Sequence, residues 1–398
     1  MNSNDKITVL RGPERVRRRP AVIFGAMGAE GATNALMGVI NIFVAEAALG
    51  HCRSISVTQN ADNSVTVKSL DRGFALSEEL IDGKPSWYYD LCELYFPKGE
   101  PNKDCFLELG QLHNKLYGDD SEQYLNVEGD PFFDLTCAQY ASEFMEVRVS
   151  DGCLLKQLRF EKGFCTNELT KQPFSGEKYT EIHFKPDPEV FGAFETDGEK
   201  LKERLKAATA TVKGLECEYS NQTTGEAVLY SYPNGICSLL EELTFGKECT
   251  PVYTAEISAK GRERYDQKEY NAKARVAVAF GNEAAGTFCI HNHRMLKNGG
   301  RQLDSVLKAV TKYINYALAK ELLNGMFKKE QLDVKDVAKR LVLVIETECE
   351  NYATRWENGR RESIDNKVLA NMAHDAIGEP FMTFLKENLA AVCEAFKP

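Results

Sequence analysis

The sequence predicts an α+β protein of two domains. Strand patterns come in pairs joined by short polar turns, such as residues 60–63 and 150–152, which is typical of antiparallel hairpins. Helical patterns fall between groups of strands and do not alternate with single strands, so a parallel βαβ sheet is not expected. A chain of 398 residues with 43% hydrophobic content is long enough for two cores. We place the domains at residues 1–232 and 233–398.

The first domain begins with a helix and a hairpin. Residues 31–49 are rich in Ala, Leu, Met and Val, which predicts a largely buried helix that Gly50 ends. Residues 81–130 show no clear period and predict loops with a short helix. The strands expected in this domain are residues 54–59, 64–69, 144–149, 154–160 and 179–184, and an amphipathic helix is expected at 198–212.

The second domain is predicted to combine a sheet with long helices. Residues 302–323 have the helical period, with apolar side chains recurring on one side from Leu303 to Leu318. Helices are also expected over residues 366–396, with a break at Gly378-Glu379-Pro380. The expected strands are residues 252–258, 274–280, 287–291 and 341–347.

Charge and cysteine usage narrow the class of protein. The net charge of −10, from 49 basic and 59 acidic residues, argues against a protein that coats nucleic acid with its whole surface. The twelve cysteines form no CxxC pair, which favours reduced, mostly buried thiols over a disulfide frame or a zinc site. No secretion signal and no apolar run of membrane-spanning length are expected. We therefore expect a soluble cytoplasmic protein without membrane contact.

Five segments, in order, resemble DNA gyrase B. Together they span nearly the whole chain. They are Arg11-Gly12-Pro13-Glu14-Arg15-Val16-Arg17-Arg18-Arg19-Pro20, Ala47-Ala48-Leu49-Gly50-His51-Cys52 with the 60–65 hairpin, Phe184-Lys185-Pro186-Asp187-Pro188-Glu189-Val190-Phe191, Asn298-Gly299-Gly300, and Asp333 to Val337 before Leu341.

The resemblance implies a fold and an activity. The fold would be a GHKL (Bergerat) ATPase-like sandwich followed by a ribosomal-S5-like transducer domain, as in the ATPase subunit of a type IIA topoisomerase. Such a subunit hydrolyses ATP with Mg²⁺. We expect no TOPRIM domain here and therefore no DNA cleavage by this chain.

The family's water-activating Glu and its magnesium-binding Asn have no counterpart here. Aligned on Gly50-His51-Cys52, the position of the general base is Gly38 and that of the magnesium ligand is Ile42, neither of which can do the chemistry. Asn41 stands where the family has Asp. A shift of one residue would put Asn41 on the metal but would still supply no base.

The other nucleotide-binding positions are also altered. Ser69 replaces the Asp that recognises adenine, while Arg72 and Gly73 are kept. The stretch 130–138 stands for the glycine-rich phosphate loop but has no glycine and two acids. Arg361 takes the place of a Lys that reaches the γ-phosphate, with a different donor geometry.

Some family residues survive in positions that favour a retained scaffold. Glu46 and Arg72 match a salt bridge that ties helix to strand, and Thr180 matches a Thr in the pocket wall. We therefore predict a pseudo-ATPase without cofactor, acting as a binding or regulatory module related to DNA topology. The expected partners are a second copy of the chain, joined through the amino-terminal domain, or a functional topoisomerase subunit.

Two further groups of residues are weighed against simpler interpretations. The spacing of His291 and His293 on a predicted strand resembles a metal site, but no carboxylate or Cys is near, so we expect no metal. Basic residues of the second domain are candidate DNA contacts, although solvated charge is the simpler interpretation. These residues are Lys260, Arg262, Arg264, Lys273, Arg275, Arg294, Lys297 and Arg301.

Two alternative functions stay open. The first is a working ATP-dependent type IIA topoisomerase subunit or fragment with relocated catalytic groups, which would use ATP and Mg²⁺. The nearest carboxylate on the same helix, Glu46, lies about 12 Å from Gly38, which is too far. The second is an acidic protein that sequesters gyrase subunits or mimics DNA, as the net charge of −10 suggests.

Overall fold

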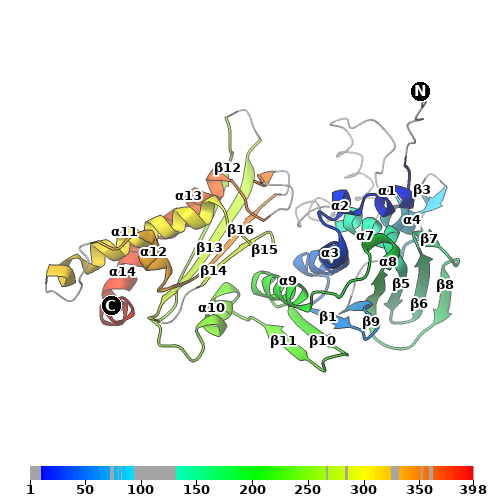
Figure 1. Ribbon diagram of the computed structural model, residues 1–398, viewed down its shortest axis with the longest axis horizontal. Coiled ribbons are helices and arrows are strands. Elements are labelled where there is room, and N and C mark those ends of the chain that lie inside the picture. The colour runs from blue at the N-terminus through cyan, green and yellow to red at the C-terminus, as the bar shows by residue number, and fades with distance from the viewer. Residues whose placement is uncertain are drawn as a thin grey trace. The chain divides into compact units, whose positions relative to one another are not determined.

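The computed structural model describes most of the chain as two compact units. The described residues are 10–71, 76–78, 80–81, 83–93, 131–265, 268–282, 286–323, 331–350, 353–357 and 362–397. The first unit comprises Met1–Leu205 and Leu215–Tyr230, and the second comprises Lys206–Gly214 and Ser231–Pro398 (Figure 1).

The first unit is built on a nine-stranded sheet with the order β11-β10-β1-β2-β9-β5-β6-β7, in which β8 also pairs with β6. Strands β1 and β10 are parallel, and the neighbouring pairs β1–β2, β2–β9, β9–β5 and β5–β6 are antiparallel. The strands are β1 Ser54–Gln59, β2 Val65–Leu70, β5 Ser142–Asp151, β6 Leu154–Glu161, β7 Phe164–Cys165, β8 Thr170–Pro173, β9 Lys178–Pro186, β10 Glu216–Asn221 and β11 Ala227–Ser231; β3 Leu80–Ile81 and β4 Lys84–Pro85 form a separate pair.

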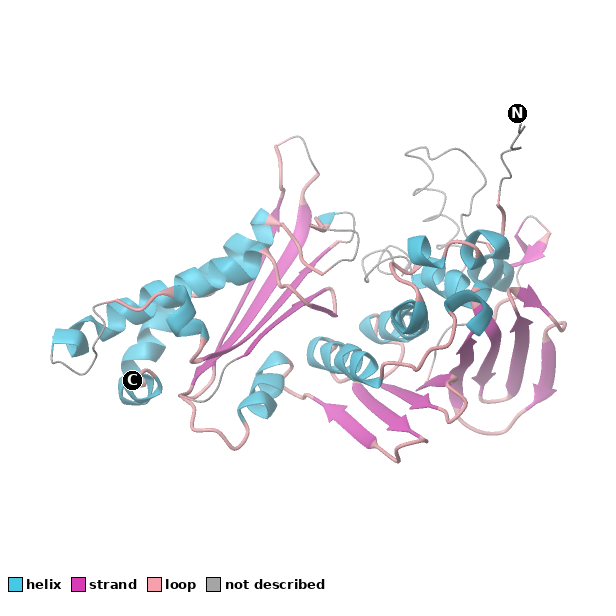
Figure 2. Ribbon diagram, viewed as in Figure 1, coloured by secondary structure: helices cyan, strands magenta, loops and turns pink. Residues whose placement is uncertain are grey.

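Helix α3 (Gly28–Ala48) packs on this sheet over β1, β2 and β9 and also contacts α7 (Pro131–Tyr140) (Figure 2). Contrary to the sequence prediction, α3 is long and apolar enough to cross a membrane, and no other described helix is. Because 78% of its most apolar stretch is buried inside the protein, it has the character of a core helix. The remaining helices of this unit are α1 Pro13–Arg17, α2 Pro20–Ile23, α4 Ser86–Cys92, α8 Pro188–Phe191 and α9 Gly198–Thr211.

The second unit has a five-stranded sheet with the order β12-β13-β16-β14-β15. One face carries the buried side chains Val276, Val278, Leu343 and Ile345, which share a core with the apolar side of helix α11. The strands are β12 Tyr253–Gly261, β13 Tyr270–Phe280, β14 Gly286–His291, β15 Arg294–Leu296 and β16 Leu341–Cys349. The helices are α10 Ile236–Thr244, α11 Arg301–Leu323, α12 Val334–Ala338, α13 Lys367–Asp375, α14 Glu379–Glu387 and α15 Leu389–Ala395.

Two sequence expectations are wrong in the structure. The stretch taken as the counterpart of a phosphate loop is helical from Pro131 onward, as part of α7. His293 is not on a strand, because β14 ends at His291 and the chain turns through Asn292 and His293 with φ of 45° and 68°. The two histidines therefore do not share a strand face.

Candidate functional site

Four of the positions predicted for the nucleotide site lie on elements that pack against one another. Gly38 and Ile42 are one turn apart on α3, which packs on β2 and β9. Ser69 on β2 lies opposite Thr180 on β9 in the antiparallel pair. The structure thus places four of the predicted positions on neighbouring elements.

These four positions are closed to solvent. Ile42 and Ser69 are each 1% exposed and Thr180 is 0% exposed. Gly38 is also buried. The side chains of Phe132 and Phe133, which the sequence suggested as filling groups, lie outside the described residues. At the positions of the general base and the magnesium ligand, Gly38 and Ile42, the structure therefore exposes no polar side chain to solvent.

Asn41 is held by another helix. Its Oδ1 accepts a hydrogen bond from Nε of Arg204 on α9, at 3.0 Å. Arg204 is itself 6% exposed, so this contact is buried. The amide oxygen that a shifted alignment would give to a metal ion is thus engaged by a cation.

Glu46 forms a buried pair that the sequence did not predict. Its Oε2 lies 2.8 Å from Nδ1 of His51, and the two side chains are 2% and 11% exposed. Arg72 and Gly73 lie outside the described residues, so the salt bridge between Glu46 and Arg72 stays a prediction. The adjacency of Glu46 to the Gly50-His51-Cys52 turn was the only sequence signal for the observed pair.

The thiol of Cys52 and the hydroxyl of Ser69 are buried close to Glu46. Burial, together with the negative charge of Glu46, raises the pKa of Cys52 to about 12, so the thiol stays protonated. Ser69 Oγ opposes this rise slightly, but it makes no hydrogen bond of good geometry to any described residue. A carboxylate at position 69 would be buried as a charged group, which costs much more free energy than burying the small Ser hydroxyl.

The described residues on either side of the segment that would carry the γ-phosphate contact are held by β-bridges. Trp356 bridges Ile364 in antiparallel fashion, and Ile364 also bridges Gly300 at the start of α11. The Trp356 ring meets the ring of His291 edge-on, with 5.7 Å between centroids. Arg361 itself lies outside the described residues, so its role stays a prediction.

Half of the candidate DNA contacts are paired with carboxylates of the same chain. The pairs are Arg262 with Glu269 at 2.7 Å, Lys273 with Glu256 at 3.5 Å, Arg275 with Glu346 at 2.5 Å and Glu348 at 3.2 Å, and Arg301 with Asp365 at 2.6 Å. Lys260, Arg264 and Lys297 make no ion pair with a described residue, and Arg294 is only partly exposed. Internal neutralisation weakens the attraction of this group for phosphates.

The two histidines with metal-like spacing are engaged separately. His291 contacts the hydroxyls of Thr347 and Thr354 through its two ring nitrogens, at 3.0 and 2.9 Å. His293 Nδ1 lies 2.8 Å from the hydroxyl of Thr211. Over the described ranges no group of three or more His, Cys, Asp or Glu side chains is arranged to hold a metal ion.

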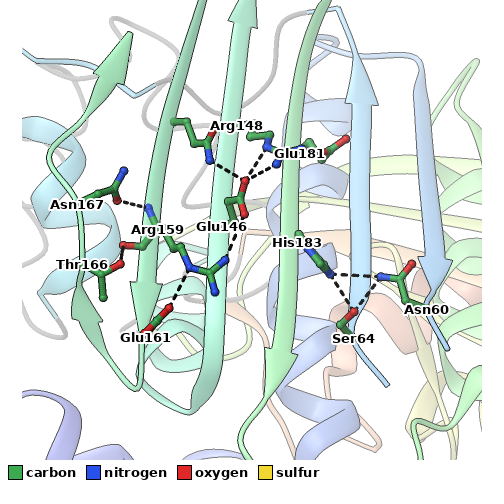
Figure 3. A network of polar contacts seen from close by, with 11 residues as sticks. Asn60, Ser64, Glu146, Arg148, Arg159, Glu161, Thr166, Asn167, Glu181 and His183 are labelled. Carbon is green, nitrogen blue, oxygen red and sulfur yellow. Dashed lines mark hydrogen bonds and ion pairs between the residues drawn. The ribbon is translucent and has the colours of Figure 1, made fainter. Parts of the chain in front are cut away.

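The opposite face of the first sheet carries a polar network that satisfies its own charges (Figure 3). Glu146 on β5 accepts from Arg148, Gln157 and Arg159, with Arg148 Nε at 2.7 Å and Gln157 Nε2 at 2.7 Å. Arg148 also contacts Glu181 on β9. These side chains tie three strands together, and their balanced charge gives no reason to assign a ligand there.

This fold and arrangement define the class of protein: an α+β chain with a GHKL-type ATPase-like sheet and helix layer. Residues 235–395 match the family model of DNA gyrase B. The chain is 26% identical to DNA gyrase B of Clostridium acetobutylicum, covering 96% of this chain and 56% of that protein. It is 25% identical to the gyrase B of Thermotoga maritima, covering 97% and 57%.

Solved structures agree with the fold. The 43K ATPase domain of Thermus thermophilus gyrase B, solved with an aminocoumarin, superposes with a TM-score of 0.66 at 22% identity, covering 96% of this chain and 92% of that one. The chain is thus gyrase B-like, resembling the amino-terminal half of a type IIA topoisomerase ATPase subunit, and the predicted α+β GHKL class is confirmed. It spans about half the length of the curated relatives it matches. The assignment of the second unit as a transducer stays a prediction.

Proposed function

We propose that this chain is a pseudo-ATPase that serves as a binding or regulatory module related to DNA topology. The observation that carries the proposal is the pair Gly38 and Ile42. By resemblance they stand at the positions of the general base and the magnesium ligand, and both are buried on α3. Loss of a general base alone slows such a reaction by roughly 10²–10⁴.

Two further contacts support the proposal. Asn41 is engaged by Arg204, which makes it a poor substitute ligand for a metal. Glu46 is engaged by His51 and stands eight residues along the helix from Gly38, about 12 Å away. Neither side chain is placed to replace what is lost.

Calorimetric titration with ATP and Mg²⁺, combined with a phosphate-release assay, tests the proposal. We expect no binding heat beyond dilution and no release above the blank. Micromolar affinity with steady phosphate release would end the proposal in favour of a working ATPase subunit. Phosphate release that does not co-elute with the chain on size-exclusion chromatography is assigned to a contaminating enzyme, and release that does co-elute counts against the proposal.

A separate substitution tests the alternative in which the catalytic groups have moved to other positions. If Glu46 acted as a substitute base, Glu46→Ala would abolish any phosphate release by the wild-type chain. We expect the variant to leave the baseline unchanged while lowering stability, since His51 loses its buried partner.

The regulatory role is tested with a functional topoisomerase. We propose that the chain acts in the cytoplasm through a topoisomerase subunit, DNA or a second copy of itself. Added to a supercoiling reaction, it should change the rate and co-purify with one of the subunits. An unchanged rate together with no co-purification would count against both the regulatory role and the sequestering alternative.

A further inference from the structure

Strand β12 is the longest sheet-edge strand in the described part of the chain. It has nine residues, against five for β11, three for β15 and two for β7. It pairs only with β13 among the described residues, so its other side presents backbone N–H and C=O groups without a strand partner. Natural proteins usually keep such edges short or block them, because they are templates for a further strand.

The charges on β12 are arranged in a way that suits a second copy of the same strand. Thr254, Glu256, Ser258 and Lys260 lie on one face and are all exposed. An antiparallel pair related by a two-fold axis at Ser258 would set Glu256 opposite Lys260 of the other copy, twice. On the other face it would set Ile257 opposite Ala259. Opposite charges directly across a strand pair stabilise it, and like charges destabilise it.

The same charges disfavour the two registers in which the axis is moved by two residues. With the axis at Lys260, two lysines would face each other, and with the axis at Glu256, two glutamates would. Lys260 makes no ion pair with a described residue and is available to a partner. Glu256 lies at the longer distances of 3.5 and 3.8 Å from Lys273 and Arg275, with its side chain 51% exposed.

We infer that β12 is a self-association edge, at which two copies of this chain join their five-stranded sheets into one antiparallel sheet centred on Ser258. This surface belongs to the second unit and is independent of the nucleotide site. The proposal therefore stands or falls separately from the pseudo-ATPase proposal, which is tested by nucleotide binding.

Sedimentation of the full chain measures the association, and charge reversal tests the surface. Lys260→Glu places Glu256 opposite a second glutamate in the homodimer, and Glu256→Lys places two lysines opposite each other. We expect each variant alone to weaken the dimer by about tenfold or more. A mixture of the two variants restores all opposite pairs, so it should form a heterodimer at wild-type affinity. This rescue also shows that both variants fold.

A control and a cross-link complete the test. Lys308→Glu makes the same charge change on an exposed position of α11 and should leave the dimer intact. Ser258→Cys should form a disulfide with its own copy, because facing residues of antiparallel strands lie about 4.5–5.5 Å apart at Cα, within disulfide range. Thr254→Cys would be about 26 Å from its own copy in this register and should not cross-link.

Several results would overturn the inference. One is a wild-type chain that stays monomeric at the highest soluble concentration. A second is a dimer that Lys260→Glu and Glu256→Lys leave unchanged, which would place association elsewhere. A third is cross-linking of the Thr254→Cys variant but not of the Ser258→Cys variant, which would exclude this register.

Discussion

A single buried side chain, His291, shows how the fold controls charge. It is 0% exposed, and both ring nitrogens contact threonine hydroxyls. Burial lowers the pKa of His291 from 6.5 to about 3, because the imidazolium would lose its hydration. The neutral ring is thus part of the native state across the physiological range.

The sign of the pH effect follows from this shift. The unfolded chain takes up the proton near pH 6.5 and the folded chain does not, so the stability is complete above that pH and falls as pH drops toward 3. Because the unfolded chain binds this proton, we expect the unfolding free energy to fall by about 2 kcal/mol between pH 6.5 and about pH 5. Urea denaturation at the two pH values measures it.

Two variants isolate the contribution of His291. His291→Gln keeps hydrogen-bonding atoms but does not titrate, so it should flatten this acid slope. His374→Gln changes an exposed histidine, 49% exposed beside Asp375, and should leave the slope as it is. An unchanged slope in His291→Gln would contradict the assignment.

Among the individual site residues, sequence reasoning found positions but not contacts. Gly38 and Ile42 lie on α3, and Ser69 and Thr180 face each other on the strands against which α3 packs, because motif order along the chain reflects the fold; their joint role in a site stays a prediction. The Asn41–Arg204 hydrogen bond joins residues 163 positions apart, and only the packing of α9 against α3 creates it. Such contacts have no local sequence signature.

Secondary structure was predicted best where periodicity is strong. The predicted strand at 54–59 is β1, and the helix predicted at 302–323 is α11 within one residue. The sequence does not predict strand β10, Glu216–Asn221, because the segment is short and mixes charged with buried residues. Its pairing with β1 is parallel and joins residues far apart in the chain, so no local turn signal marks it. Helix α7 was missed although Pro131 opens it, in the position where proline suits a first turn.

The side chain of Arg17 links helix α1 to three other segments. Arg17 donates to Asp187 at 2.5 Å and to the carbonyl oxygens of Tyr140 and Ser142, so it joins α1 to three other segments. Asp187 is 2% exposed in its side chain and also caps α8. Removing Arg17 would leave this carboxylate buried without its cation.

We expect Arg17→Ala to lower the unfolding free energy of the first unit by about 3 kcal/mol. Arg18→Ala is the matched control, because Arg18 is 62% exposed and, among the described residues, its ion pair is with Glu14 one turn away. That exposed pair contributes about 0.5 kcal/mol or less. Denaturant titration followed by far-UV circular dichroism compares them, and equal losses in both variants would refute the anchoring role.

For the whole molecule, charge limits how DNA can be bound. The chain carries a net charge of −10, and Arg262, Lys273, Arg275 and Arg301 are paired internally. The candidates without a described ion pair are Lys260, Arg264 and Lys297, all exposed. If these contact phosphates, the logarithm of the binding constant should fall with the logarithm of salt concentration with a slope no steeper than about −3.

Fluorescence anisotropy with a short duplex across a salt series measures this slope. Lys297→Glu should make the slope shallower by about one unit, because each lost phosphate contact releases one counterion fewer. Arg301→Gln should leave it nearly unchanged, because Arg301 is already paired with Asp365. A much steeper slope, or equal effects of the two variants, would contradict this expectation. Either result would mean that DNA breaks the internal ion pairs and that the paired arginines and lysines also contact phosphates.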